Sequence, residues 1–333
     1  MRGASGAVLL FVLALVALLS ALAVQTVRTS QLEVFSAYAG IYSRQAEAMA
    51  ESGLLAAASL LAADEASRAS VNLTQDWASF PQLTSYPGKW FLDGQLQGRI
   101  DDELGKFPVN SLHPGLTGHA VYGAVFLRLL QAPPFSLPSG KAQALLAALV
   151  DWLDPDDVPA NGGAEDAAYQ ADALSYRVKN NSLDTLGELL CVKGFSRELL
   201  YGRDKTPGLF SLLTVWGPGL VNVNTAPVEV LAALPANIDA SRARTVAKAL
   251  DDYRRDPVRR DRLETLEWLG QAAPDQGLRW PSEILTTRSV YFSVTLEGVS
   301  GAASKRLFAV LKRNQQRRSA KAPDWDVLYR ELR

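Results

Sequence analysis

Cysteine and histidine are almost absent from this chain of 333 residues, which contains one cysteine and two histidines. The single cysteine, Cys191, excludes an internal disulfide, and its apolar Leu-Leu-Cys-Val setting predicts a small core residue and not a reactive thiol. His113 and His119 are six positions apart, which is not the spacing of a helical ligand pair, and no cysteine lies near them to complete a zinc site. We therefore expect the protein not to be an enzyme. The one enzymatic alternative is a metal-dependent hydrolase that combines one of these histidines with an acidic loop.

An excess of positive charge is also absent. Lys and Arg number 34 against 35 acidic residues, so no overall basic field attracts nucleic acid. With 48% hydrophobic and 21% charged residues, a chain of this length can bury enough core for about two domains.

Charged side chains are missing between Arg2 and Arg28, and residues 7–24 are apolar except for Ser20. A helix over this stretch reaches across the roughly 30 Å hydrocarbon core of a bilayer. The basic end predicts that the N-terminus stays in the cytoplasm and that the rest of the chain lies outside it. Three interpretations remain open: a secretory signal cleaved after residues 21–23, a permanent anchor, or a short leader cut after Gly6 that leaves the apolar run on the mature protein.

The helix is predicted to continue beyond the membrane, because residues 24–63 contain no proline and only two glycines. Larger apolar residues recur here at spacings of three, four and seven, which indicates one stripe of an amphipathic helix. The stripe consists of Tyr38, Ile41, Tyr42, Met49, Leu54, Leu60 and Leu61.

The pattern then changes from loop to strand. Residues 64–84 are polar and are predicted to be a loop, whereas 89–92 and 95–100 are predicted to be strands joined by the hairpin turn Asp93-Gly94. Residues 101–112 are predicted to be an acidic turn leading into a strand, and strands return at 290–296 and 305–311. Helices are predicted between them, at residues 121–130, 141–152, 185–193, 196–200, 227–234, 241–253 and 260–269. This order predicts one sheet interrupted by a largely helical insertion of about 170 residues.

An acidic loop within the predicted insertion carries a dense set of oxygen ligands and a Gly pair. Its members are Asp151, Asp154, Asp156, Asp157, Asn161, Gly162, Gly163, Glu165 and Asp166. Such a loop can fold around a hard cation such as calcium, although its spacing differs from the EF-hand pattern. The chemistry alone leaves open a solvated loop in which Asp151 and Glu165 cap helices.

Residues 223–253 resemble a helix-hairpin-helix module, with Thr225 as the predicted N-cap of the first helix. The hairpin at residues 235–238 lacks the glycine that lets backbone N–H groups approach phosphate. The basic residues around it are balanced by acidic ones. We therefore predict protein contact and no nucleic-acid binding, with a membrane-anchored DNA-binding or DNA-uptake factor as the alternative.

Taken in order, the leader and the segments 105–112, 151–154, 162–166, 221–227 and 289–292 resemble the K-type minor pseudopilin of type II secretion, the GspK family. The resemblance implies an α+β fold with a pilin-like long N-terminal helix packed on a small antiparallel sheet. It also implies a large all-α inserted domain that contains the helix-hairpin-helix-like module. The predicted divisions are a leader at 1–6, a transmembrane or filament-core part at 7–27, the head at 28–111 and 281–333, and the insertion at 112–280.

The same resemblance implies processing and location. A prepilin peptidase would cut between Gly6 and Ala7, with methylation of the new terminus, and the protein would be a single-pass protein of the inner membrane with its globular part in the periplasm of a Gram-negative bacterium. Most pilins have Glu at the fifth position after the cut; here it is Phe11, and the K type is similar in lacking this Glu. Calcium binding by the inserted domain is implied as well, with Asp151, Asp154, Asp156, Asp157, Glu165 and Asp166 as candidate ligands.

The implied function is that of a subunit at the pseudopilus tip that helps to initiate assembly for protein export. The expected partners are the I-type and J-type minor pseudopilins, other pseudopilins, secreted substrates and the outer-membrane secretin. Tyr38, Ile41 and Tyr42 are the residues that we expect to contact partner helices, since the head can cover only the later part of the stripe.

Overall fold

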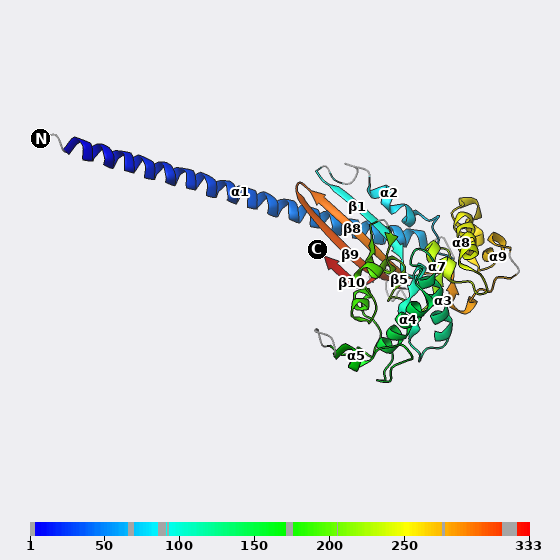
Figure 1. The fold of residues 1–333 in the computed structure, drawn as a ribbon. Helices are drawn as coiled ribbons and strands as arrows, with labels where there is room; N and C mark the ends of the chain where they lie inside the picture. The colour runs from blue at the N-terminus through cyan, green and yellow to red at the C-terminus, as the bar shows by residue number, and fades with distance from the viewer. Residues whose placement is uncertain are drawn as a thin grey trace.

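A helix of 62 residues, α1 (Ala4–Glu65), leads into a compact head and projects far beyond it (Figure 1). The computed structural model describes residues 4–65, 70–85, 91, 93–170, 176–204, 206–274, 277–314 and 325–333. The helix is uninterrupted because it has no proline, and its two internal glycines are tolerated for different reasons. Gly40 has open space around it, whereas a Cβ at Gly53 would lie 2.9 Å from the Leu296 side chain. Gly53 therefore lets the helix approach the sheet closely.

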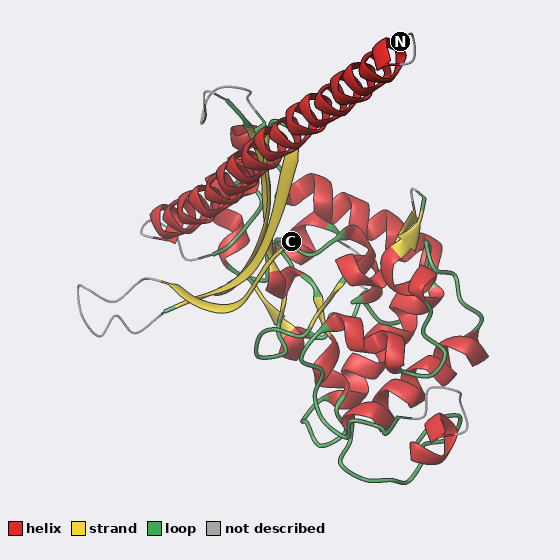
Figure 2. Cartoon of the chain, turned by 90° about the vertical axis from the view of Figure 1, so that its left-hand side faces the viewer, coloured by secondary structure: helices red, strands yellow, loops and turns green. Residues whose placement is uncertain are grey.

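The head contains a four-stranded antiparallel sheet in the order β1-β8-β9-β10. Its strands are β1 (Gln95–Asp102), β8 (Tyr291–Ser300), β9 (Ala303–Arg313) and β10 (Trp325–Leu332). The second half of α1 lies across one face of this sheet (Figure 2). The short helix α2 (Phe80–Thr84) covers the β1 edge, where the Thr84 hydroxyl accepts a hydrogen bond from the Gly98 N–H at 3.1 Å. That bond occupies a backbone group that a sheet edge would otherwise leave free.

The insertion begins after β1 and ends before β8, so it lies between the first strand of the sheet and the other strands. Its helices are α3 (His119–Gln131), α4 (Ser139–Leu153), α5 (Asp166–Gln170), α6 (Arg197–Tyr201), α7 (Val228–Ala233), α8 (Ala240–Arg254) and α9 (Trp268–Ala272). It also contains pairs of two-residue strands, which are β2 (Phe107–Pro108) with β5 (Leu213–Thr214), β3 (Gly202–Arg203) with β4 (Thr206–Pro207), and β6 (Val221–Asn222) with β7 (Leu285–Thr286). The described part of the insertion is therefore mostly helical, and short strands connect its loops.

Two separate hydrophobic cores form in the described residues. The head core joins the inner face of α1 to the sheet, and Phe292 in it packs edge-on against both Trp77 and Trp325. The insertion core runs from Phe107 to Leu285 and includes the fully buried Trp268. The head and the insertion therefore each have their own cluster of buried apolar side chains.

Buried polar groups connect the two cores. Asp102, at the end of β1, accepts hydrogen bonds from Leu104 N, from Asn222 Nδ2 at 2.8 Å and from Thr225 Oγ1 at 2.7 Å. Asn222 also donates to the carbonyl of Val71, so one side chain contacts the segment after α1 and the end of β1. Burial raises the pKa of Asp102, although these hydrogen bonds oppose the rise.

Most predicted helices and strands are confirmed within a few residues, and several local predictions are wrong. Residues 64–84 are not all loop, since α1 extends to Glu65 and a 3-10 helix (Asp76–Ser79) precedes α2. Residues 185–193 form a 3-10 helix (Leu186–Cys191), and residues 260–269 divide into a 3-10 helix (Pro257–Glu264) and α9. The strand after the acidic turn has two residues, β2.

The predicted strand at residues 89–92, the hairpin partner of β1, lies mostly outside the described residues and stays a prediction, while β1 pairs along its length with β8. The sequence patterns also missed β10, whose charged residues hide the alternation. Two residue predictions are wrong as well. Cys191 is exposed, and Thr225 does not cap α7, since its hydroxyl donates to Asp102 instead.

Candidate functional site

The apolar stripe of α1 is only partly covered by the head. Met49, Leu54 and Leu61 are buried against the sheet, whereas Tyr38 is 54% exposed and Ile41 is 47% exposed. Tyr42 lies at the boundary, since its ring packs against the turn at Gly301. The side chains of Leu32 and Phe35, further toward the N-terminus, are exposed as well. The stripe therefore begins well before the point where the head can bury it.

The first part of α1 has the properties of a membrane-spanning helix. The helical stretch Ala7–Ala63 contains a window with a mean hydropathy of 3.0, and none of that window is buried in the protein. Phe11, in place of the usual pilin Glu, is 71% exposed. Gly6 and Ala7, the predicted processing residues, lie in the first turns of this helix. A lipid bilayer or partner helices are needed to cover such a surface.

The acidic loop brings three of its six candidate ligands together. Asp154, at the end of α4, and Glu165, just before α5, meet Asp156 so that one carboxylate oxygen of each lies within 4.8 Å of the others. Asp154 and Glu165 are buried, and among the described residues no hydrogen-bond donor contacts either oxygen of Glu165 or Oδ1 of Asp154. Buried anionic oxygens without donors fit a hard cation such as calcium, which takes its ligands from carboxylates.

The electrostatics of this cluster agree with the geometry. Burial, together with the negative charges of its neighbours, raises the pKa of Glu165 to about 7. The same causes raise the pKa of Asp154 to about 6, with His113 nearby acting in the opposite direction. Without a cation, the like charges can be relieved only by taking up protons.

The other three acidic residues have different roles. Asp151 is fully buried and accepts backbone hydrogen bonds from Ala160 and Ala164, so its side chain shapes the loop from inside. A Cβ at Gly163 would lie 1.9 Å from the Asp151 carboxylate, which explains the glycine at that position. Asp157 accepts from Asn180 Nδ2, and Asp166 accepts from Val178 N. None of these three belongs to the three-carboxylate cluster in the described residues.

The two histidines do not form a joint site. Both lie before or at the start of α3, and the Nδ1 atom of His113 accepts a hydrogen bond from Gly115 N at 2.9 Å. His113 lies close enough to Asp154 to affect the pKa of that carboxyl, but the Nδ1 atom of His113 already accepts the hydrogen bond from Gly115. This arrangement gives no support to a histidine-assisted hydrolase.

The helix-hairpin-helix-like module is observed as α7 and α8 packed together, with Asp239 capping α8 through a bond from Arg242 N at 3.0 Å. Arg254, at the end of α8, is buried and donates to the carbonyls of Val223 and Ala226. Its charge is balanced by Asp251 at 2.6 Å. This arginine is thus part of the scaffold and is not available to bind phosphate.

Sequence reasoning missed the buried polar contacts that join the head to the insertion and hold loops of the insertion together, although the motifs that contain them were noticed. In the segment 221–227, Asn222 and Thr225 bind Asp102, and Asn224 Nδ2 donates to Leu263 O at 2.8 Å. In the segment 105–112, Asn110 exchanges hydrogen bonds with the backbone of Leu183. The signal was present as small polar residues between buried apolar ones, which indicates buried side-chain to backbone hydrogen bonds.

A long helix laid on a four-stranded antiparallel sheet, with a helical insertion between the first strand and the others, places this chain in the pilin-like class of proteins. Its fold is similar to a chain of the crystal structure of the GspK-GspI-GspJ complex from the type 2 secretion system of enterotoxigenic Escherichia coli, with a TM-score of 0.61. That match covers 92% of this chain and 99% of the other at 19% sequence identity, so it shows the shared fold.

Sequence comparison identifies the family. The family model for type II secretion system protein K matches residues 105–202. Type II secretion system protein K of Pseudomonas aeruginosa is 32% identical over 255 residues, which is 74% of this chain and 73% of the relative. The protein K of Pectobacterium carotovorum is 33% identical over 125 residues, which is 35% of this chain and 38% of the relative. The chain belongs to the type II secretion system protein K family.

Proposed function

We propose that this protein is a minor pseudopilin at the tip of the type II secretion pseudopilus, where it assembles with I-type and J-type minor pseudopilins and helps to initiate the pseudopilus. The observation that carries the proposal is the uncovered apolar stripe of α1, since Tyr38 and Ile41 lie beyond the reach of the head. Apolar side chains spaced along a helix fit the apolar stripe of another helix. The related fold of a chain in the GspK-GspI-GspJ complex supports partners of these types.

The tip position rests on shape. The insertion lies at the end of the molecule opposite the N-terminus, so it occupies the space where an identical subunit would stack (Figure 1). Phe11 supports the same position, because a subunit with nothing above it has no neighbouring amine to neutralise. A non-catalytic role follows: the protein shapes the tip and meets other pseudopilins, secreted proteins or the outer-membrane secretin.

The test is co-purification of the full-length protein, in detergent, with I-type and J-type minor pseudopilins. A complex with one copy of each is expected. Ile41→Asp should weaken it by about tenfold or more, because a charge in the centre of a helix contact must be desolvated. Val258→Asp is the matched control, since Val258 is 91% exposed in the insertion and far from α1 in sequence. Self-polymerisation of this chain, or equal effects of both substitutions, would contradict the proposal.

We also propose that Asp154, Asp156 and Glu165 hold a calcium ion that stabilises the insertion. The support is the set of buried carboxylate oxygens without donors and the raised pKa values of Asp154 and Glu165. Bound calcium would neutralise the repulsion and join the end of α4 to the start of α5. The hydrogen bonds that Asp151 accepts from the loop backbone hold the loop in shape, and these bonds do not depend on the ion.

Thermal melting with chelator and with excess calcium tests this second proposal. At a calcium concentration one hundred times the dissociation constant, the gain in stability is about 2.7 kcal/mol. Glu165→Gln should abolish the gain, whereas Asp261→Asn, an exposed acidic residue outside the cluster, should leave it unchanged. Equal melting of the unmodified protein in chelator and in calcium would mean that the loop binds no structural calcium.

The proposal also covers the cellular location of the protein and the boundaries of its domains. We infer that residues 7–27 span the inner membrane after cleavage between Gly6 and Ala7, and that the globular part lies in the periplasm. The exposed apolar surface of α1 supports a membrane position. We further infer that residues 112–280 are an inserted domain and that 28–111 and 281–333 are the head, a division that the two separate cores support.

A further inference from the structure

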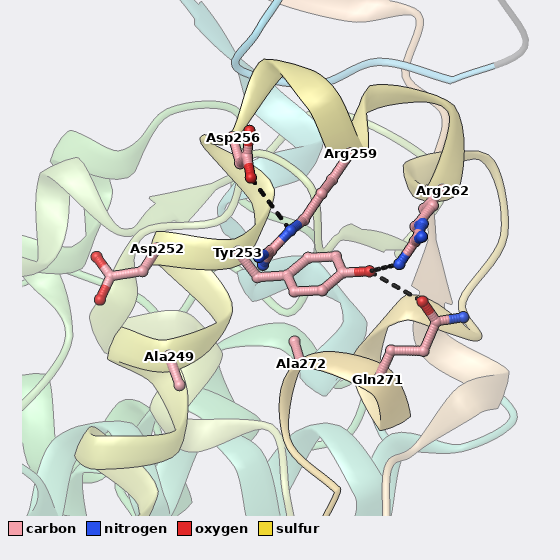
Figure 3. A pocket seen from close by; sticks show the side chains of 8 residues that line it. All are labelled: Ala249, Asp252, Tyr253, Asp256, Arg259, Arg262, Gln271 and Ala272. Carbon is pink, nitrogen blue, oxygen red and sulfur yellow. Dashed lines mark hydrogen bonds and ion pairs between the residues drawn. The ribbon is translucent and has the colours of Figure 1, made fainter.

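A hollow of about 1010 Å³ opens on the insertion between α8, the 3-10 helix Pro257–Glu264 and α9 (Figure 3). It is separate from the acidic cluster and from α1, and it lies at the end of the molecule opposite the N-terminus (Figure 1). The Tyr253 ring crosses the middle of it and stacks on the buried Trp268 ring, with 5.8 Å between centroids. The base of the hollow is therefore rigid.

Two arginines reach over this tyrosine from the same 3-10 helix (Figure 3). The guanidinium of Arg259 lies 4.4 Å from the ring centroid, and its Nε is 3.2 Å from Asp256 Oδ2. The other oxygen of Asp256 accepts from Val258 N at 3.0 Å. The Tyr253 ring and the Asp256 carboxylate thus hold Arg259 in place. Both oxygens of Asp256 already accept hydrogen bonds, so this carboxylate has little capacity left to bind a ligand.

Arg262 is in a different situation. Its side chain is exposed, and among the described residues it has one polar contact, a long one of 3.5 Å to the Tyr253 hydroxyl. That hydroxyl donates to Gln271 Oε1 at 2.9 Å, so within the described residues the amide nitrogen of Gln271 is left as a free donor. The hollow therefore has N–H donors of Arg262 and Gln271 on either side of the Tyr253 hydroxyl, and Arg262 has no acidic partner among the described residues.

We propose that this hollow binds a glutamate or aspartate side chain from an acidic peptide segment of a partner protein. Arg262 would make the paired hydrogen bonds that its planar guanidinium forms with a carboxylate, and the Gln271 amide would add a third. The Arg259–Tyr253 stack provides a flat wall for the aliphatic part of the side chain.

The rim determines which anion is accepted. Asp252 is exposed at the rim and, within the described residues, has no hydrogen bond or ion pair, whereas the charge of Asp256 is balanced by Arg259. Arg262 is thus left with one positive charge, which one carboxylate matches, whereas the second negative charge of a phosphate would be left facing Asp252. The charge pattern thus favours a carboxylate over a phosphate group. This inference goes beyond the proposed function and does not depend on it, because binding can be measured on this protein alone.

Fluorescence anisotropy of the full-length protein in detergent tests the inference. The probe is a labelled peptide, acetylated and amidated at its ends, with two glutamates in an alanine-glycine background, and the same peptide with glutamines is the comparison. The glutamate peptide should bind and the glutamine peptide should not. Arg262→Gln should weaken binding at least about tenfold, because it removes a charge-assisted pair. Asp252→Asn should tighten binding about two- to threefold, because it removes a like charge.

Arg244→Gln is the matched control, since Arg244 is an exposed arginine of α8 outside the hollow, and it should change nothing. Arg262 is exposed, so its substitution should leave the melting temperature unchanged and the variant remains interpretable. Equal binding of the two peptides would overturn the inference. So would binding that requires a free C-terminal carboxylate, tighter binding of a phosphoserine peptide, or an Arg262→Gln variant that binds normally.

Discussion

Individual carboxylates in the acidic loop have different roles because their donors differ. Asp151 accepts hydrogen bonds from two backbone N–H groups, whereas buried Glu165 accepts none from the part of the chain that the structure describes. Position in the sequence does not separate them, since both belong to the same acidic stretch. The difference comes from the path of the loop. It places backbone N–H groups next to the carboxylate of Asp151 and the carboxylates of Asp154 and Asp156 next to that of Glu165.

At the residue scale, the raised pKa of Glu165 predicts a pH dependence of stability without calcium. In the unfolded chain this carboxyl has its ordinary pKa of 4.5, and in the folded protein the pKa is about 7. The folded state therefore holds the proton over this range while the unfolded state loses it, so stability falls as the pH rises from about 4.5 to about 7. Above pH 7 the loss is complete, and it amounts to about 1–2 kcal/mol after allowance for solvent screening.

Denaturant unfolding in chelator at a series of pH values measures this dependence. Glu165→Gln should flatten the pH profile and make the calcium-free protein more stable at pH 8. Asp261→Asn, outside the cluster, should leave the profile as it is. A stability that rises with pH over the same range in the unmodified protein would show that Glu165 is not a buried, unpaired acid.

The elements of the head show how one helix can serve two environments. The second half of α1 is covered by β8 and β9, and the first half has no cover within the described residues. The two edge strands of the sheet are also held by different contacts. The β1 edge is blocked by α2 through Thr84, while β10 is tied to α1 by an ion pair between Arg330 and Glu51. The packing of α1 on β8 and β9, together with the ion pair to β10, keeps the helix aligned with the head.

At the element scale, we predict that α1 begins at Ala7 in the mature protein. Gly6→Leu should block cleavage, because a peptidase that acts at this small residue has no room for a branched side chain. Full-length precursor should then accumulate in the inner membrane, as measured by mass spectrometry and N-terminal sequencing. The conservative Gly6→Ala variant should be processed in larger part.

The mature N-terminus itself distinguishes the alternatives. A start at Val24 would indicate an ordinary secretory signal, and an intact Met1 would indicate a simple anchor. Normal processing of Gly6→Leu would also contradict cleavage at this position.

On the scale of the whole molecule, the head and the insertion are joined by buried polar contacts. Asp102 accepts from both Asn222 and Thr225, so the end of β1 is held to the segment that precedes α7. Glu103 follows it and accepts from Thr214 while pairing with Lys106. Burial raises the pKa of Glu103, but the charge of Lys106 and its hydrogen bonds outweigh burial, so the pKa is lowered overall.

Removal of Asp102 should therefore loosen the junction between the two cores. We predict that Asp102→Ala destabilises the protein by about 3 kcal/mol or more, because several buried donors lose their acceptor. Asp101→Ala is the matched control: its carboxylate pairs with exposed Arg99, and its loss should cost under about 0.5 kcal/mol. Equal losses of unfolding free energy in the two variants would mean that Asp102 does not hold the junction.

The sequence alone predicted the apolar first part of α1, the extent of the amphipathic helix that follows it, a helical insertion between strands of one sheet, and the family. These features depend on composition and period, which are local properties of the chain. The same locality explains the errors. Thr225 has the residue type and position of an N-cap, yet the tertiary fold brings the buried Asp102 carboxylate within reach of its hydroxyl.

Only the tertiary structure decided which acidic residues meet, at which residue of the stripe the cover by the head begins, and that Arg262 has no acidic partner among the described residues. Asp154 and Glu165 are eleven positions apart in the sequence and come together because α4 ends, the loop turns at Gly162 and Gly163, and Asp151 binds the loop backbone. Contacts between distant residues depend on packing that closes loops of many residues, and a one-dimensional pattern does not contain that information.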